Sequence, residues 1–101
     1  MDGIVFSWDE KKSVTNQEKH GVSFEEAQSV FADDYGRLIP DPDHSEDEGR
    51  FILLGLSNQV RLLMVCHCYR EKGGVIRIIS ARKADKAETK QYRDFRHAKK
   101  L

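Results

Sequence analysis

Three apolar runs follow one another in the segment FILLGLSNQVRLLMVCHCYREKGGVIRIISA, residues 51–81. The runs are FILLGL, RLLMVCHCY and VIRIISA, and the short polar segments SNQV and REKGG separate them. Apolar runs joined by short connections with paired glycines are typical of antiparallel hairpins. The segment therefore predicts a three-stranded antiparallel meander at the centre of the fold.

The middle run predicts a strand that is covered on both faces, because successive side chains of a strand point to opposite sides. One face would carry Leu62, Met64, Cys66 and Cys68, and the other Leu63, Val65, His67 and Tyr69. Two cysteines side by side on one strand face have a poor geometry for a disulfide. We therefore expect two buried structural thiols, and a structural role for His67.

Upstream of the meander, the sequence predicts a short strand at residues 4–6 and two helices. Asp9 suits the N-cap of a helix over residues 10–20, which would end at Gly21. Ser23 and Glu26 form an S-x-x-E capping box at the start of the second helix. Its apolar stripe would consist of Phe24, Ala27 and Phe31, with Val30 at the margin. Residues 35–39 are expected to be extended.

The first helix has almost no apolar side chain except Val14, so burial gives it little support. At 100° per residue, Lys12, Asn16 and Lys19 fall on one face, with His20 at its edge. A polar stripe thus stands where a core stripe is expected.

A last helix is expected from Ala84 onward, where the helical period returns. Its apolar stripe would consist of Ala84, Ala87, Phe95 and Ala98, with Tyr92 at the border. Its basic ridge would consist of Lys86, Lys90, Arg93, Arg96 and Lys100. Together these elements predict one α+β domain over residues 1–101, a small antiparallel sheet with two N-terminal helices and a C-terminal helix.

The charges of this 101-residue chain are unevenly distributed although they balance overall. Residues 1–60 carry five basic and 13 acidic side chains, whereas residues 61–101 carry 12 basic and four acidic ones. Such a domain can attract a polyanion to one surface and a basic partner to another, or the two portions can pair internally. No apolar run approaches the roughly 20 residues that span a bilayer, so we expect a cytoplasmic protein that contacts no membrane.

Several kinds of chemistry find no support in the sequence. Residues 41–49, DPDHSEDEG, read as an exposed acidic loop, and its possible ligands Asp41, Asp43, His44 and Glu46 lack the spacing of known metal motifs. No G-x-S-x-G elbow and no glycine-rich phosphate loop is present. We therefore expect neither a metal nor another cofactor.

The third apolar run carries basic residues that suit a phosphodiester. Arg77 interrupts the strand, and a guanidinium there must find solvent, a carboxylate or a phosphate. Ser80 and Arg82 share a face at the strand's end, followed by Lys83. Several guanidiniums at one strand end can stabilise the charge that develops on a phosphate. Internal pairing with the acidic portion is the alternative.

Several blocks in the same order resemble the BrnT family, the toxin halves of bacterial type II toxin–antitoxin pairs. The blocks are F-S-W-D-E-x-K at 6–12, N-x-x-K-H-G-V-S-F-E-E-A at 16–27, V-F at 30–31, D-x-x-H-S-E-D-E-x-R at 41–50 and R-I-I-S-A-R-K-A at 77–84. The resemblance implies a RelE-like fold and an endoribonuclease that acts on mRNA and blocks translation. It also implies a BrnA-like antitoxin partner, through which the toxin would contact operator DNA.

With this resemblance, the basic and polar residues gain candidate roles. The candidate catalytic residues are Lys12, His20, Arg61, Arg77, Arg82 and Tyr92, and the candidate RNA-binding residues are Asn16, Lys19, Lys83 and Lys90. The arginines would contact the phosphate, Lys12 or His20 would move protons, and Tyr92 would stack on a base or donate a proton. Imidazole suits proton transfer at neutral pH, although a histidine before Gly21 can also simply cap helix carbonyls.

Two positions depart from the family pattern. Val60-Arg61 stands where Gly-Arg is expected, which changes the turn more than the chemistry. Glu88-Thr89 stands where Glu-Arg is expected, and Lys90 lacks the bidentate fork of an arginine. The alternative function is therefore a weak or inactive binding module that serves as a corepressor subunit in an antitoxin–DNA complex.

Overall fold

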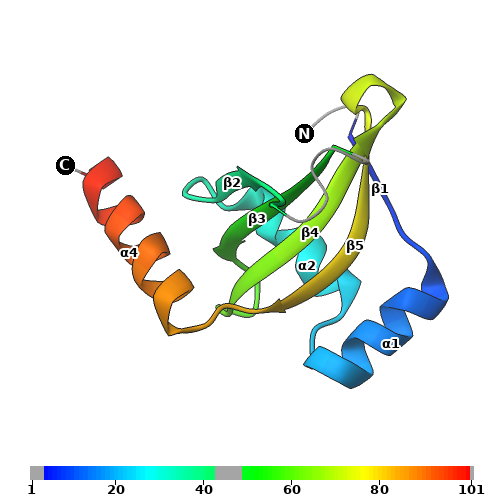
Figure 1. Cartoon of the computed structure of the whole chain (residues 1–101), viewed down its shortest axis with the longest axis horizontal. Helices are drawn as coiled ribbons and strands as arrows, with labels where there is room; N and C mark the ends of the chain where they lie inside the picture. The colour runs from blue at the N-terminus through cyan, green and yellow to red at the C-terminus, as the bar shows by residue number, and fades with distance from the viewer. Residues whose placement is uncertain (1–3, 43–48, 101) are drawn as a thin grey trace.

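The structure, a computed structural model, describes residues 4–42 and 49–100. Its centre is a five-stranded sheet in the order β1-β5-β4-β3-β2 (Figure 1). The strands are β1 (Val5–Ser7), β2 (Arg37–Pro40), β3 (Arg50–Leu56), β4 (Leu62–Arg70) and β5 (Val75–Lys83). The helices are α1 (Glu10–His20), α2 (Phe24–Ser29) and α4 (Lys86–Lys100), with short 3₁₀ turns η1 (Val30–Ala32) and η2 (Glu71–Gly73). The predicted α+β class is confirmed.

The predicted meander is confirmed, because β3, β4 and β5 pair antiparallel in sequence order. The extended segment after α2 forms β2 and adds to the free side of β3. The sheet is mixed rather than wholly antiparallel, because β1 pairs parallel with β5. A hairpin forces neighbouring strands to run antiparallel, whereas β1 and β5 are far apart in sequence and no turn fixes their relative direction.

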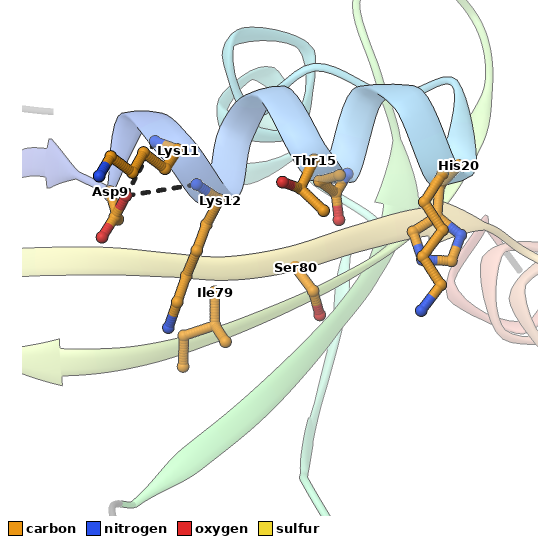
Figure 2. A pocket seen from close by; sticks show the side chains of 9 residues that line it. Asp9, Lys11, Lys12, Thr15, His20, Ile79 and Ser80 are labelled. Atoms are coloured by element: carbon orange, nitrogen blue, oxygen red, sulfur yellow. Dashed lines mark hydrogen bonds between the residues drawn. The ribbon is translucent and has the colours of Figure 1, made fainter.

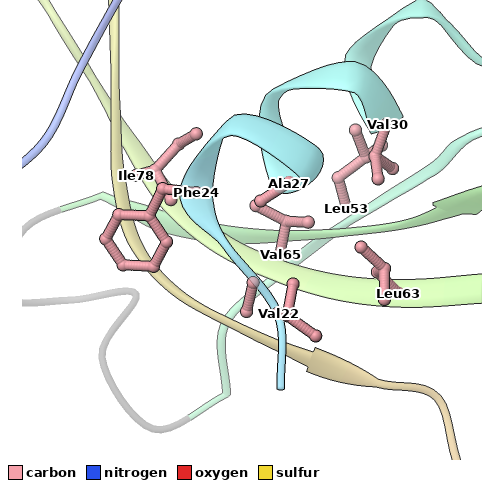
Figure 3. Packing of buried hydrophobic residues seen from close by; sticks show 9 residues of the cluster. Val22, Phe24, Ala27, Val30, Leu53, Leu63, Val65 and Ile78 are labelled. Carbon is pink, nitrogen blue, oxygen red and sulfur yellow. The ribbon is translucent and has the colours of Figure 1, made fainter. Parts of the chain in front are cut away.

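The two faces of the sheet differ in what covers them. On the side that we call the α2 face, Leu53, Leu63, Val65 and Ile78 pack against Phe24, Ala27 and Val30 (Figure 3). The opposite side, which we call the arginine face, carries Leu54, Met64, Cys66, Cys68, Arg77, Ser80 and Arg82, as their pairing register shows. Tyr92 of α4 covers Leu54 and Met64 there. The remainder of the arginine face carries the polar and basic residues.

A β-bulge brings Arg77 onto this face. Cys66 pairs with Ser80, whereas the next residue of β4, His67, pairs with Ile78, so Ile79 is an extra residue in β5. Strict alternation would place Arg77 on the opposite face from Ser80 and Arg82. Because of the extra residue, all three side chains lie on one face.

Helix α1 begins and ends where the sequence predicts. The Asp9 carboxylate accepts hydrogen bonds from the backbone N–H groups of Lys11 and Lys12, and Gly21 adopts a left-handed conformation with φ of 71°. Asn16, a predicted RNA-binding residue, is buried. Its Nδ2 donates to the carbonyls of Val22 and Ala81 at 2.8 and 2.9 Å, and its Oδ1 accepts from the Ala81 N–H at 3.0 Å.

This amide completes the edge of the sheet. Strand β1 pairs only with Val75–Arg77, so the backbone of β5 beyond those residues has no strand beside it on that side. The side chain of Asn16 satisfies both the N–H and the C=O of Ala81, as a neighbouring strand would. Helix α1 is therefore attached along the edge of β5 through polar bonds rather than through an apolar stripe.

Helix α2 has half of its predicted capping box. The Ser23 hydroxyl accepts a hydrogen bond from the Glu26 N–H. The Glu26 carboxylate does not return to the cap but binds Ser57 and Arg61 in the β3–β4 connection. The helix is consequently tied to the hairpin on which it packs.

Helix α4 is anchored differently from the predicted alanine stripe. Tyr92, which was predicted at the border of that stripe, is buried, with 4% of its surface exposed. Ala87 and Ala98, which were predicted within the stripe, are exposed. Asp85 and Glu88 form reciprocal backbone–side-chain bonds at its start. The tyrosine ring buries much more apolar area than two methyl groups, which explains why it determines the buried side.

The described part of the chain contains no helix that is both long and apolar enough to cross a membrane.

Candidate functional site

A concave strip runs from α1 across β5 onto the arginine face. One hollow of about 440 Å³ lies between α1 and β5, and a second of about 330 Å³ lies over the arginine face. His20, Ile79 and Ser80 line both hollows, so the two form one continuous surface. We call this surface the basic strip, because its cationic side chains are Lys11, Lys12, Lys19, Arg50 and Arg82, with His20 at the centre.

The side of the strip formed by α1 is a row of polar side chains one or two helical turns apart. Figure 2 shows Lys12 reaching across Ile79 at one end of the helix, and His20 near the other end, beyond Ser80. The side chains of Lys12, Lys19 and His20 make no ion pair or hydrogen bond with another described residue. These basic side chains are therefore available to a ligand. The whole polar stripe predicted on this helix lines the strip, although the amide of Asn16 is bound to the backbone.

The sheet contributes guanidinium groups. Arg77 and Arg50 both lie opposite Cys68 in register, on neighbouring strands to either side of β4. Both therefore stand on the arginine face, where Arg50 lines the strip and Arg77 lies beside it without lining either hollow. Arg77 is half-buried and forms no ion pair within the described residues.

Arg50 was not among the predicted site residues. It starts β3, and alternation places it on the same face as Ile52 and Leu54. The signal that could have revealed it is its position in the D-x-x-H-S-E-D-E-x-R block together with the register of β3 on β4. That register is set by the geometry of the β3–β4 turn, and the amino-acid composition of this connection does not determine the geometry.

Arg82 lies in the strip but is already paired. Its NH1 and NH2 donate to the two carboxylate oxygens of Glu88, both at 2.8 Å, in a bidentate fork. The Arg82 guanidinium lowers the pKa of Glu88, and hydrogen bonding to Glu88 raises the pKa of Arg82. The arginine side chain stays 45% exposed, so the pair lies at the surface of the strip.

Arg61, a predicted catalytic residue, is bound within the protein and lies outside the strip. Its guanidinium pairs with both oxygens of Glu26, a carboxylate of which only 2% is exposed, and NH2 also donates to the carbonyl of Gly21 at 2.9 Å. Hydrogen bonds from Arg61 lower the pKa of Glu26 although burial opposes that shift. The arginine thus fastens the corner between α1 and α2 to the β3–β4 hairpin.

Tyr92 is also part of the internal structure. Its hydroxyl donates to Asp33 Oδ2 at 2.6 Å, and the same oxygen accepts from the backbone N–H of Leu56. Burial and the nearby Asp33 raise the pKa of Tyr92 to about 12. The ring packs on Leu54 and Met64 and does not itself line the strip, although Met64 does.

The remaining predicted residues are dispersed. Lys83 pairs in register with Leu63 and so lies on the α2 side of β5, opposite to Arg82. Lys90 lies on the exposed surface of α4, where it bonds to Asp94 at 2.7 Å. Neither lines the basic strip.

The predicted acidic loop begins beside the strip, at Asp41. Asp41, expected in an exposed loop, is buried and accepts a hydrogen bond from the Cys66 thiol at 3.4 Å. Burial and this carboxylate raise the pKa of Cys66 to about 11, consistent with a structural thiol. Asp43, His44 and Glu46 lie outside the described residues, and no three His, Cys, Asp or Glu side chains cluster within them.

His67 has the structural position that the sequence predicts. It is fully buried, its Nδ1 lies 3.0 Å from the carbonyl of Val65, and its Nε2 lies 3.1 Å from the hydroxyl of Tyr69. Burial lowers the pKa of His67.

The fold has a counterpart among solved structures. The crystal structure of the Brucella abortus ribonuclease toxin BrnT is similar to this chain, with a TM-score of 0.64 and 22% sequence identity, over 82% of this chain and 99% of that one. At this identity the likeness establishes the fold. No curated protein matches the chain.

The sequence family is also established. The model for the ribonuclease toxin BrnT of type II toxin–antitoxin systems matches residues 8–88. The chain therefore belongs to the BrnT family of ribonuclease toxins, as the sequence blocks predict. Lys12, His20, Arg77 and Arg82 lie inside the matched range, whereas Lys90 and Tyr92 lie beyond it.

Proposed function

We propose that this chain is an endoribonuclease that cleaves mRNA at the basic strip and thereby blocks translation, and that a BrnA-like antitoxin neutralises it and connects it to operator DNA. The observation that carries the proposal is the meeting of α1 and β5, where Lys12 and His20 border one concave surface with Ser80 and Arg82. A surface with several cations suits a polyanionic backbone. Membership of a ribonuclease toxin family supports RNA as that polyanion.

The chemistry that fits the strip is attack of the RNA 2′-OH on the adjacent phosphate. This reaction needs alignment, neutralisation of charge on the phosphate and proton transfer to the leaving 5′-oxygen. Arg77, Arg50 and Lys12 would bind the phosphate charge, and His20 would exchange protons with the 2′-OH or the 5′-oxygen. Lys19 would bind a neighbouring phosphate along α1. Metal independence stays a prediction of this scheme.

The test uses the purified chain and a single-stranded RNA in EDTA. We expect fragments that end in 2′,3′-cyclic phosphate. His20→Ala should lower kcat/KM about 10²- to 10⁴-fold, and Arg77→Ala about 10²- to 10³-fold. The matched controls His97→Ala and Arg93→Ala change the same residue types on α4 and should leave the rate within about twofold.

Two results would contradict the proposal. One is RNA that stays intact with the wild-type chain, and the other is cleavage to which His20→Ala and Arg77→Ala make no difference. In a cell-free translation reaction, the wild-type chain should stop protein synthesis and His20→Ala should not. If synthesis stops equally with both, the link between cleavage and translation is wrong.

One observation favours the second candidate, a weak or inactive corepressor subunit. Glu88 occupies both terminal nitrogens of Arg82, the arginine at the end of the R-I-I-S-A-R block. If this fork holds activity down, Glu88→Gln should raise the rate of RNA cleavage severalfold. If the variant and the wild-type chain both leave RNA intact, while the complex with antitoxin binds DNA more tightly than antitoxin alone, the corepressor role is the correct one.

A further inference from the structure

A second concave surface lies on the other side of the sheet from the basic strip. It is a groove of about 590 Å³ between β1, the α2–η1 segment and the β3–β4 connection. The groove and the basic strip share no lining residue. Phe6 pairs in register with the buried Ile76, so the groove opens beside the α2 face rather than the arginine face.

The floor of the groove is apolar and rests on the core. Phe6 and Phe31 stack edge to face, with ring centroids 5.2 Å apart, and both pack on the core beneath them. Ile4 extends the floor along β1. A preformed apolar floor can take an apolar side chain from a partner without the protein having to rearrange.

The rim of the groove is acidic. Glu25 and Asp34 line it from opposite ends of the α2–η1 segment, and its remaining polar residues, Gln28, Ser29 and Asn58, are uncharged. Both carboxylates are exposed and form no ion pair with another described residue. Among the residues that the structure describes, no lysine, arginine or histidine lines the groove. A surface of this kind repels phosphates and attracts cations.

We infer that this groove binds a segment of the protein antitoxin in which lysine or arginine side chains flank an apolar anchor residue. The charge of the rim selects a basic segment, and the phenylalanine floor selects the anchor. The inference rests on the proposed antitoxin partnership but does not depend on RNA cleavage. Because the groove lies apart from the basic strip, antitoxin bound there would leave the strip's residues uncovered by that segment.

The experiment compares two charge-matched double variants of the full chain. Glu25→Lys with Asp34→Lys reverses the rim, whereas Glu18→Lys with Glu71→Lys reverses two exposed carboxylates outside the groove and outside the strip. The probe is the purified antitoxin encoded beside the gene for this chain, with affinity measured by calorimetry. We expect the rim variant to raise Kd at least tenfold and the control variant to raise it no more than twofold.

Further measurements separate the explanations. Ala32→Trp fills the groove without changing its charge and should also weaken binding, while melting temperature and RNA cleavage of the rim variant match the wild-type chain. In an array of overlapping antitoxin peptides, the peptide that binds best should carry at least two basic residues around an apolar one, and the rim variant should not bind it.

The outcomes are distinguishable. If the wild-type chain does not bind the antitoxin, the partnership fails and the groove proposal fails with it. If the wild-type chain binds and the rim variant binds equally well, only the groove proposal is overturned. The same holds if the best peptide is acidic, or if the rim variant instead abolishes self-association of the chain, which would make a second copy the occupant.

Discussion

Helices α1 and α4 each carry basic side chains that line a hollow together with the sheet, but the hollows beside α1 also carry Arg50 and Arg82, whereas Arg93 and Arg96 of α4 face Leu56 and Leu62. On α1, Lys12, Lys19 and His20 border the basic strip and have no described partner. On α4, Lys90 bonds to Asp94, and Arg96 lies over the ring of Tyr35 with its carbon Cζ 4.8 Å from the centroid. The number of cations on a helix is therefore a poor guide to a site.

The two helices also differ in how they are attached. Helix α1 depends on the Asn16 amide and on Arg61, which binds the carbonyl of Gly21 directly after the helix ends. Helix α4 depends on the Tyr92 ring and on the surface pair between Glu88 and Arg82. Polar groups that are buried carry a larger penalty when a partner is lost. Substitutions at the attachment of α1 should therefore cost more than the equivalent ones at α4.

The largest effect is expected for Asn16→Leu. The substitution conserves the approximate volume but leaves the N–H and C=O of Ala81 and the carbonyl of Val22 without their side-chain partners. At about 1–3 kcal/mol for each unsatisfied buried group, the free energy of unfolding should fall by roughly 3 kcal/mol or more. Denaturant unfolding measures this loss. Asn58→Leu, at an exposed position, is the control and should change stability by less than about 0.5 kcal/mol.

The second test compares the two glutamates that bind arginine. Glu26→Gln should lower the free energy of unfolding by about 3 kcal/mol, because the guanidinium of Arg61 would then lie beside a buried side chain that no longer carries the opposite charge. Glu88→Gln should cost about 1 kcal/mol, because Arg82 is largely hydrated. Equal costs for the two variants would contradict the difference between the helix attachments.

The pH dependence provides a control for the glutamate comparison. Both glutamates have a pKa below the ordinary 4.5 in the folded chain. Their contribution is therefore complete above pH 4.5 and is lost as the pH falls through the lowered pKa. The difference in stability between wild type and Glu26→Gln, followed by denaturant unfolding, should shrink as the pH falls from 6 towards 3. A stability difference that stays constant with pH would show that Glu26 stabilises the fold through packing rather than through its charge.

Tyr92→Phe tests whether α4 is attached mainly through its ring. The variant keeps the ring on Leu54 and Met64 and removes only the hydrogen bond to Asp33. We expect a loss of about 1 kcal/mol and an unchanged rate of RNA cleavage. Tyr92→Ala, which removes the ring, should cost about 3 kcal/mol. A large loss of cleavage in a stable Tyr92→Phe chain would restore the predicted catalytic role of the hydroxyl.

The smallest effect is expected at Val60, in the turn between β3 and β4. This exposed β-branched residue has φ of 60°, a conformation that glycine adopts without strain. Val60→Gly relieves about 1–2 kcal/mol of backbone strain in the folded state. The greater conformational entropy of glycine stabilises the unfolded state by about 0.5–1 kcal/mol, which opposes part of this gain. A net gain of about 0.5 kcal/mol should appear as a small rise in melting temperature, and a loss of stability would show that the valine side chain contributes contacts.

The central meander was predictable because its apolar runs, alternation and turns are local signals that agree with one another. The faces of β4 and the ends of α1 followed from the same local rules. The parallel pairing of β1 and the position of Tyr92 did not follow, because both depend on packing between segments that are distant in sequence.

The candidate site was predictable only in part. Lys12, Lys19 and His20 were placed correctly on one side of α1, and Arg82 on the sheet. That Arg77 shares a face with Arg82 depends on the bulge at Ile79, which strict alternation does not reveal. A sequence also cannot show which polar side chains the fold uses for itself. Arg61, Arg82 and Tyr92 each bind a carboxylate of the chain, so internal pairing, the alternative to phosphate binding, holds for part of the set.

The Asn16 amide has a consequence for the behaviour of the chain in concentrated solution. An open strand edge is a template on which another molecule can add a strand, and such edges lead to aggregation. In this protein the N–H and C=O of Ala81, on the part of β5 beyond its pairing with β1, are satisfied by one side chain of α1 rather than by a strand. If α1 detaches locally, the N–H and C=O of Ala81 become free to bind another strand before the sheet itself unfolds. The bonds of Asn16 therefore also protect this edge from fibre-like assembly.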